Sequence, residues 1–176
     1  VFSLEDEYTG EKIGSKLERI REMMKENGCN AHVLSSLDDI AWLLNIRGND
    51  IAYCPLVLSY AIVYNNSVEL FADIRKFSDD IINLLAENQV KIYPYEDIYR
   101  KVSEMTSEDK LLLDSSIMNY RLYQAISKDT VIVDKQNPEI LMKSVKNETQ
   151  TENLRKAHLK DAVAHTKFMY WLKKNI

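Results

Sequence analysis

The alternation of short apolar runs with amphipathic segments is the feature that most constrains the fold of this chain. Between residues 31 and 145, runs rich in β-branched, aromatic and leucine residues are separated by segments with helical spacing. We predict six strands, at residues 31–35, 56–64, 68–72, 90–95, 110–114 and 130–133. Strands interleaved with helices pack as a sheet that carries helices on its faces. The pattern therefore predicts an α/β fold with a mixed six-stranded sheet.

The segments between these strands have the apolar spacing of helices. We predict helices over residues 15–27, 36–44, 78–87, 97–105, 117–126 and 139–145. Ser15 is expected to be the N-cap of the first helix because Glu18 follows three residues later, and Gly28 is expected to end it. The sequence Asn-Asn-Ser at 65–67 suits a tight turn because Asn tolerates positive φ. The strands on either side of it are therefore predicted to form an antiparallel hairpin.

The two ends of the chain differ from this pattern. Residues 1–14 are acidic and weakly patterned, and we interpret them as a linker that leads into a domain of residues 15–146. Residues 147–174 contain neither Gly nor Pro and predict one helix, about 40 Å long at the usual rise. The stretch 168–172 is apolar around most of its circumference, so it needs cover from more than one side. We expect residues 147–176 to begin a further domain that continues past Ile176.

Charge and composition exclude several classes of function. The chain has 23 basic and 27 acidic residues, a net charge of -4 that gives no electrostatic footprint for nucleic acid. Its apolar runs are shorter than the roughly 18 residues of a membrane span, and its first residues lack the pattern of a signal peptide. Cys29 and Cys54 cannot form a disulfide scaffold and suit a reducing compartment. These features predict a cytoplasmic protein that binds neither nucleic acid nor membrane.

Motifs for nucleotide binding and for nucleophilic catalysis are absent. The glycines, at positions 10, 14, 28 and 48, do not have the spacing of a dinucleotide fingerprint or a P-loop. Neither cysteine has an identifiable histidine partner, and the sequence Gly-x-Ser-x-Gly does not occur. His32 lies between apolar neighbours in a predicted strand, and we interpret it as a packing residue. The sequence therefore offers no catalytic residue.

The clustered acidic and histidine residues have ordinary structural interpretations. Asp38, Asp39, Asp79 and Asp80 are interpreted as charges at helix N-termini, and Asp114 as a turn residue after a strand. In the terminal helix, Asp161 and His165 are spaced so that both could reach one metal ion, whereas His158 and His165 are about 10.5 Å apart along the axis. We interpret these three residues as a polar stripe, so no metal site is predicted.

The loop at residues 46–55 is the most distinctive part of the sequence. It places an arginine, an amide, a carboxylate and a phenol between two apolar elements. Polar groups on a short loop with rigid flanks are how a scaffold presents a recognition site. The alternative is a plain connection in which Arg47 and Asp50 form a surface ion pair of little energy. The candidate site residues are Arg47, Asn49, Asp50 and Tyr53.

Two motifs resemble the middle domain of the long, three-domain X-Pro aminopeptidases (aminopeptidase P). The first is LDDIAWLLNIRGND at residues 37–50, followed by Tyr53, Pro55 and the sequence SYAI at 59–62. The second is SVKN at 144–147, followed by Glu152, LRKAH at 154–158 and KDAVA at 160–164. In that family the second run bridges the middle domain to the first helix of the catalytic domain. The sequence YTG at residues 8–10 resembles the start of the middle domain.

This resemblance implies a creatinase N-terminal-like fold and a role in a larger enzyme. The full enzyme would remove the N-terminal residue that precedes proline, using two divalent metal ions, usually manganese. Two Asp, one His and two Glu of a catalytic domain with a "pita-bread" fold would hold the metals, and none of these ligands can be placed within residues 1–176. We therefore expect no activity from this chain alone. The resemblance implies that it caps the active-site cleft and limits access to short peptides, with the four candidate residues facing the cleft.

The sequence leaves two other functions open. One is an assembly module that docks through the apolar stretch at 168–172 onto a partner, including a second copy of the chain in a homodimer. The other is a small-molecule binding domain of flavodoxin-like shape, which the absence of a phosphate loop disfavours. In the leading interpretation, the partners are the catalytic domain of the same protein and the X-Pro peptide substrate.

Overall fold

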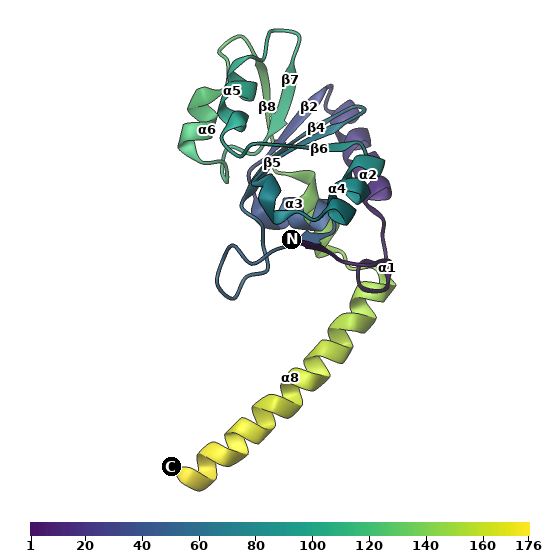
Figure 1. Ribbon diagram of the computed structural model, residues 1–176, viewed down its shortest axis with the longest axis vertical. Coiled ribbons are helices and arrows are strands. Elements are labelled where there is room, and N and C mark those ends of the chain that lie inside the picture. The colour runs from purple at the N-terminus through teal and green to yellow at the C-terminus, as the bar shows by residue number, and fades with distance from the viewer.

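A mixed sheet lies at the centre of the structure, a computed structural model that describes residues 1–176 (Figure 1). Its strand order is β6-β5-β4-β2-β7-β8, and β4 runs antiparallel to both of its neighbours while the other pairs are parallel. This arrangement confirms the predicted α/β fold with a mixed six-stranded sheet. The strands are β2 (Ala31–Leu34), β4 (Ser59–Tyr64), β5 (Val68–Ala72), β6 (Val90–Tyr93), β7 (Lys110–Leu113) and β8 (Val131–Asp134).

The predicted hairpin forms between β4 and β5. Tyr60 lies opposite Phe71, and Val63 lies opposite Val68. β4 begins at Ser59 rather than at residue 56, because the residues before it bond to the preceding loop instead of to the sheet. The N–H of Leu58 donates to the Asp50 carboxylate at 2.8 Å, and the N–H of Asp50 donates to the carbonyl of Leu56 at 3.2 Å.

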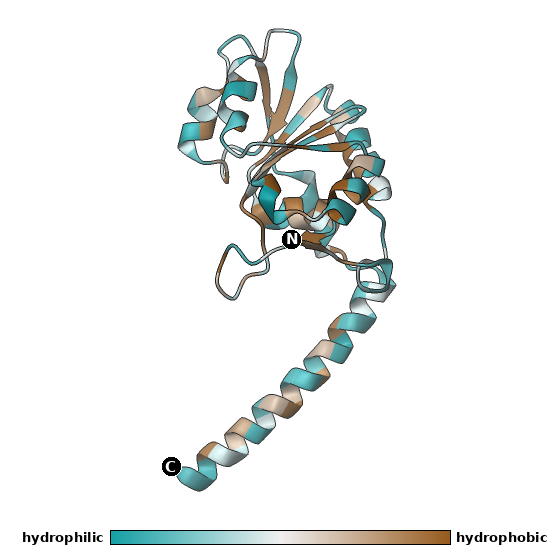
Figure 2. Ribbon diagram, in the orientation of Figure 1, coloured by the Kyte–Doolittle hydropathy of each residue, from teal (hydrophilic) through white to brown (hydrophobic).

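Helices cover both faces of the sheet. α2 (Ile13–Glu26), α3 (Leu37–Leu43), α4 (Asp79–Glu87) and α7 (Pro138–Ser144) lie on one face, and α5 (Asp97–Ser103) and α6 (Tyr120–Ala125) lie on the other. Successive strand residues face opposite sides, so Val33 packs under α5 and α6 while Leu34 packs under α2 and α3. The strands are accordingly rich in hydrophobic residues, whereas the helices combine hydrophobic with hydrophilic residues (Figure 2).

The first fourteen residues are not a free linker, which corrects the expectation from their weak pattern. β1 (Phe2–Ser3) pairs antiparallel with β3 (Ile46–Arg47), and α1 (Asp6–Thr9) follows. The prediction that Ser15 caps the first helix is also wrong. α2 begins at Ile13, whose side chain is buried in the core, and the hydroxyl of Ser15 donates to the Glu11 carboxylate at 2.8 Å.

The last helix, α8 (Glu148–Asn175), extends away from the rest of the molecule (Figure 1). Its 28 residues span about 42 Å, and none of them is buried. Asn147 caps it reciprocally: the Asn147 side chain accepts from the Gln150 N–H at 2.8 Å, and the Gln150 side chain accepts from the Asn147 N–H at 3.2 Å. The Asn147 amide also donates to the Thr9 carbonyl at 2.8 Å. Neither α8 nor any other helix is both long enough and apolar enough to cross a membrane.

Candidate functional site

A loop of residues 48–58, here called the projecting loop, connects β3 to β4 and extends on the same side of the molecule as α8 (Figure 1). At its tip, Ile51 and Cys54 form an isolated antiparallel bridge. Tyr53 within this turn has a φ of 63° and a fully exposed side chain. A tyrosine held in the left-handed region, with its ring in solvent, is unusual and is enriched at functional turns. The phenol of Tyr53 is therefore available for contact with another molecule or domain.

The base of the projecting loop is fixed by Asp50. Its carboxylate accepts from the Leu58 N–H and, at 2.7 Å, from the ammonium of Lys76 in the short 3-10 helix η1 (Ile74–Lys76). Burial alone would raise the pKa of Asp50, but these two hydrogen bonds and the Lys76 charge lower it below its ordinary value. Gly48 allows the two sides of the loop to approach, since a Cβ there would lie 2.6 Å from a methyl group of Val57.

Arg47 turns away from the projecting loop. Its Nη1 donates to the carbonyls of Ala41 at 2.7 Å and Ile46 at 2.8 Å, so the guanidinium holds the end of α3. The alternative of a surface ion pair between Arg47 and Asp50 is therefore wrong, because Asp50 pairs with Lys76 instead. Of the four predicted site residues, Asn49 and Tyr53 are exposed on the loop, Asp50 supports it, and Arg47 lies behind it.

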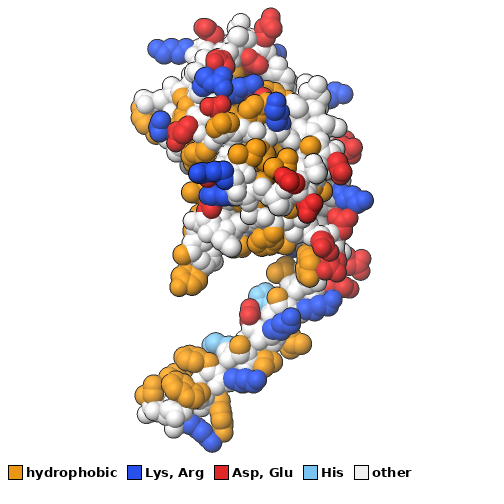
Figure 3. Space-filling view, viewed as in Figure 1, with side chains coloured by type: hydrophobic (Ala, Val, Ile, Leu, Met, Phe, Trp, Pro, Cys, Tyr) orange, Lys and Arg blue, Asp and Glu red, His pale blue; other side chains and the backbone are white.

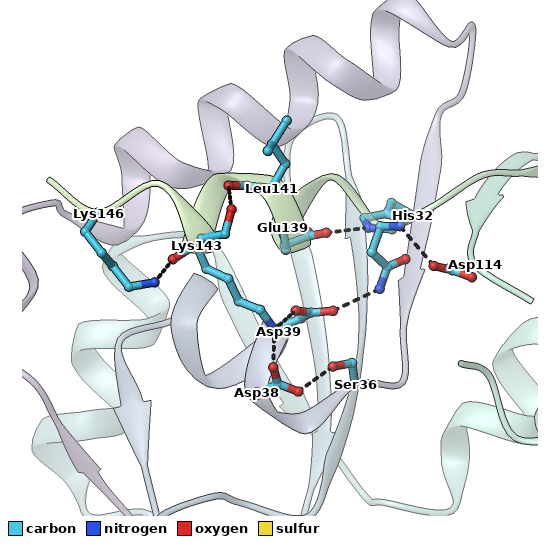
Figure 4. A network of polar contacts seen from close by, with 11 residues as sticks. His32, Ser36, Asp38, Asp39, Asp114, Glu139, Leu141, Lys143 and Lys146 are labelled. Carbon is cyan, nitrogen blue, oxygen red and sulfur yellow. Dashed lines mark hydrogen bonds and ion pairs between the residues drawn. The ribbon is translucent and has the colours of Figure 1, made fainter. Parts of the chain in front are cut away.

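A second group of polar side chains, which the sequence did not predict as a unit, is buried between the sheet and α7 (Figure 4). His32 on β2 and Glu139 on α7 are both fully buried, and Nε2 of His32 lies 3.2 Å from Oε2 of Glu139. Nδ1 of His32 lies 3.0 Å from the carbonyl of Leu112. Because a carbonyl and a carboxylate are both acceptors, this geometry favours a doubly protonated ring. His32 is thus buried, as a packing residue would be, but it also forms an ion pair.

The charge state of His32 follows from its surroundings. Burial by itself lowers the pKa of an imidazole, because the charged form loses its hydration. The Glu139 charge, the hydrogen bonds to Glu139 and Leu112, and the more distant Asp39 act in the opposite direction and together raise the pKa of His32 above its ordinary value. The carboxylate of Glu139 thus favours the charged form of His32.

Asp39 and Lys143 extend the polar group to α3. Asp39 is fully buried and accepts from the Lys143 ammonium at 2.5 Å and from the Asn137 amide at 3.1 Å. Lys143 also contacts Asp38. Asp114, after β7, accepts from the Asn137 N–H at 3.3 Å. Asp38 and Asp39 do lie in the first turn of α3, as predicted, but they also hold α7, which leads into α8 (Figure 4).

The signal for this group in the sequence was weak. A histidine flanked by Ala31 and Val33 indicates a buried polar side chain, and buried charges are paired as a rule. Its partner, however, lies 107 residues further along the chain, on a short helix whose other charged residue is Lys143. Spacing within one element cannot identify such a pair.

The surface of α8 is rich in exposed apolar side chains, and they gather at its far end (Figure 3). The rings of Phe168 and Trp171 stack with their centres 6.4 Å apart, and both side chains are about half exposed. His158, Asp161 and His165 are exposed on the same helix. Nowhere in the chain do three or more His, Cys, Asp or Glu side chains come close enough together to hold a metal ion. The exposed apolar side chains of α8 are Leu154, Leu159, Val163, Phe168, Met169, Tyr170 and Trp171.

The chain thus combines a mixed six-stranded sheet with a projecting loop and an exposed terminal helix. A sequence profile of the creatinase/prolidase N-terminal domain matches residues 1–150, and the chain belongs to that family. This confirms the family that the two sequence motifs indicated. A Bacillus anthracis Xaa-Pro dipeptidase shares the fold, with a TM-score of 0.65 at 15% identity over 90% of this chain and 44% of that one.

Its relatives at higher identity are peptidases that act at proline. The chain is 36% identical to Xaa-Pro aminopeptidase 1 of Dictyostelium discoideum and 33% identical to Xaa-Pro aminopeptidase 2 of Mus musculus, in each case over its full length. An X-prolyl aminopeptidase of Caenorhabditis elegans, a cytosolic enzyme with a di-nuclear active site, matches 98% of the chain with a TM-score of 0.88 and 31% identity. The chain spans 28%, 27% and 29% of these three proteins, respectively.

Proposed function

We propose that this chain is the non-catalytic middle domain of a metal-dependent X-Pro aminopeptidase, which releases the N-terminal residue that precedes proline. The observation that carries the proposal is the similarity to Xaa-Pro aminopeptidases. It extends over nearly all of this chain but over only a little more than a quarter of each relative. The parent protein would be a cytoplasmic hydrolase. The cytosolic relative from Caenorhabditis elegans supports that location.

The metal ions of the parent enzyme would be held outside this chain. The di-nuclear site of the Caenorhabditis elegans relative supports a pair of divalent ions, and we propose that they are manganese. The residues of this chain do not fit such a pair, since they offer no cluster of three or more metal-ligating side chains. The domain would therefore contribute shape and contacts to the enzyme and take no part in the hydrolytic step.

The first partner of the domain would be the catalytic domain of the same polypeptide. α8 exposes more than half of the Phe168, Tyr170 and Trp171 side chains, and contiguous apolar surface of this kind marks an interaction site. The projecting loop extends on the same side as α8 (Figure 1). A catalytic domain that packs along α8 would thus be positioned to face the projecting loop.

The second partner would be the X-Pro peptide substrate, which the projecting loop would meet at the rim of the cleft. Tyr53 offers apolar area with a hydroxyl group, and Asn49 offers an amide, both on a loop that Asp50 and Lys76 fix at its base. Arg47 would act from behind, because its hydrogen bonds to Ala41 and Ile46 hold the segment from which the loop departs. The loop would cap the cleft and restrict access to short peptides.

This role is tested by Tyr53→Ala and Asn49→Ala in the full-length parent enzyme. If the loop orients short peptides, kcat/KM for an X-Pro tripeptide falls about fivefold, which corresponds to about 1 kcal/mol of lost contact, and most of the change is in KM. If the loop also restricts access, kcat/KM for a decapeptide relative to the tripeptide increases. The matched control is Tyr120→Ala, which removes an exposed tyrosine of α6, on the other face of the sheet. Unchanged selectivity in both loop variants would remove the capping role.

A second function, assembly, is favoured by the same apolar end of α8. The side chains of residues 168–171 could be covered by a second copy of the chain, which would give a homodimer joined through its terminal helices. The two proposals differ in what α8 contacts: another part of the same polypeptide, or another molecule.

A further inference from the structure

An open cavity of about 740 Å³ lies between the N-terminal segment, α3 and the junction of α7 with α8. Its volume is in the range of pockets that bind small ligands. Leu4, Trp42, Ile140 and Leu154 contribute apolar surface to it, and several basic side chains contribute polar groups. Of the four candidate site residues, Arg47 lines this cavity. The three on the projecting loop do not.

Lys16 is the most unusual residue of this cavity. It is only 1% exposed, and its ammonium donates to Oδ1 of Asn45 at 2.5 Å and to the carbonyl of Trp42 at 2.7 Å. An ammonium has three N–H donors, so one donor is left without an acceptor in the protein. The Trp42 ring lies 4.6 Å from the nitrogen, but no carboxylate lies within ion-pair distance of it. A buried cation without an anion is energetically unfavourable.

Burial lowers the pKa of Lys16 to about 8, as expected for an ammonium that has lost its hydration without gaining a carboxylate. Glu11 and Asp6 act in the opposite direction but do not compensate for burial, and Arg47 and Arg19 add repulsion. With a pKa of about 8 the ammonium is still mostly charged at neutral pH, so it is a buried cation without a counter-ion.

Two further cations of the cavity also have no carboxylate partner. Arg47 donates to protein carbonyls only through Nη1, which leaves the N–H groups of Nε and Nη2 without a protein acceptor. Lys146 contacts only the carbonyl of Lys143.

Asp38 is the one acidic residue that lines the cavity, and its charge is already compensated. Asp38 pairs with Lys143, and Glu11 pairs with Arg19 at 3.0 Å. The cavity thus has an excess of positive charge in a chain whose net charge is -4.

We propose that this cavity binds an organic carboxylate, with the carboxylate group between Lys16 and Arg47 and an apolar group against Trp42 and Leu154. The arginine fork and the spare lysine donor suit the oxygens of a carboxylate, and the apolar walls suit an aliphatic or aromatic substituent. Two sources share this chemistry: a free carboxylic acid, or an Asp or Glu side chain from the remainder of the parent protein. The site is independent of the proposed role in peptide hydrolysis.

The test uses hexanoate as the probe and the 176-residue chain carrying Trp171→Phe, so that Trp42 is its only tryptophan. Hexanoate is expected to change the Trp42 emission in a saturable manner with a Kd in the millimolar range or below. Uncharged hexanamide is expected to bind at least tenfold more weakly, as is hexanoate to the Lys16→Met and Arg47→Gln variants. The matched control is Lys174→Met, at the far end of α8. The comparison of the two probes needs no substitution in the cavity and therefore holds even if a cavity substitution prevents folding.

The same titration by calorimetry on the full-length parent distinguishes the two sources. Equal affinity of the parent and the 176-residue chain indicates a free ligand. Binding to the chain alone indicates that an acidic side chain of the parent already occupies the cavity. Absence of saturable hexanoate binding to the 176-residue chain, or equal binding of hexanoate and hexanamide, would overturn the proposal.

Discussion

At the scale of single residues, the buried charges divide into those with partners and one without. Glu139 holds His32, and Lys143 holds Asp39, whereas Lys16 has two neutral acceptors and an aromatic ring. Removing one member of a buried pair is far more destabilising than replacing both by apolar groups, because a lone buried charge has no compensation. The paired and unpaired charges should therefore respond differently to substitution.

For the His32–Glu139 pair we predict that Glu139→Leu lowers the free energy of unfolding by about 3–5 kcal/mol, because it leaves a buried imidazole without its counter-charge. The double variant His32→Leu/Glu139→Leu should recover most of this loss. Urea unfolding followed by circular dichroism measures both values. A single variant as stable as the wild type would show that His32 and Glu139 do not form an ion pair.

The pH dependence of this pair has a defined sign. Since the folded pKa of His32 is raised above its ordinary value of about 6.5, the stabilisation is complete below about pH 6.5. It is lost as the pH rises through the folded pKa, because the folded protein then releases a proton that the unfolded chain has already lost. The stability of the wild type relative to the double leucine variant should therefore decrease as the pH rises above about 6.5.

Individual side-chain roles were only partly predictable. The composition of residues 46–55 correctly indicated an exposed polar loop, and Tyr53 is its tip. The direction of Arg47 was not predictable, because it depends on the carbonyls of Ala41 and Ile46, which become available only where α3 ends. The partner of Asp50 is 26 residues away, so the nearer arginine was a misleading choice.

At the scale of elements, the length of each strand or helix and the repeat of its hydrophobic residues determined whether it could be predicted from the sequence. The six strands and the helices between them each span four or more residues, which is enough for a repeat in hydrophobicity to be seen. β1 and β3 have two residues each and show no such repeat. α2 starts two residues before Ser15 because Ile13 is buried in the core, a tertiary contact that prevails over the local capping pattern.

α8 provides a prediction at this scale. Its 28 residues lack any buried side chain, so their stability rests on local hydrogen bonds and the cap at Asn147. In the 176-residue chain, the amides of α8 beyond its first two turns should exchange with solvent at least a hundredfold faster than those of β4. In the full-length parent the same amides should be protected by the catalytic domain. Slow exchange in the 176-residue chain would mean that another copy covers the helix.

At the scale of the whole molecule, the two features proposed to make contacts lie on one side. The projecting loop and α8 share it, while the other face of the sheet is covered by α5 and α6. This arrangement suits a domain that meets a single large body and has its core complete without it. The sequence indicated the two features separately, but their common direction depends on how the chain folds back through β1 and α1.

Light scattering on the 176-residue chain distinguishes the two proposed uses of this side. If α8 serves the catalytic domain of its own polypeptide, we expect a monomer of 20.5 kDa at micromolar concentration. Assembly through α8 instead predicts twice that mass, reduced to the monomer by Trp171→Glu. The same substitution at Tyr120, on the other face of the sheet, is the control. A stable dimer that Trp171→Glu dissociates would replace the leading proposal with the assembly role.

The close approach of Gly10 to Asn147 lies at the start of α8, where the direction of the whole helix is set. A Cβ at position 10 would lie 2.7 Å from Oδ1 of Asn147, the same side chain that caps the helix and bonds to Thr9. Any side chain at position 10 would therefore push on the pivot of a rod about 42 Å long. A tilt of about 10° at that pivot moves the distant tip by about 7 Å, more than the pitch of one helical turn. The direction of α8 thus depends on the absence of a Cβ at Gly10.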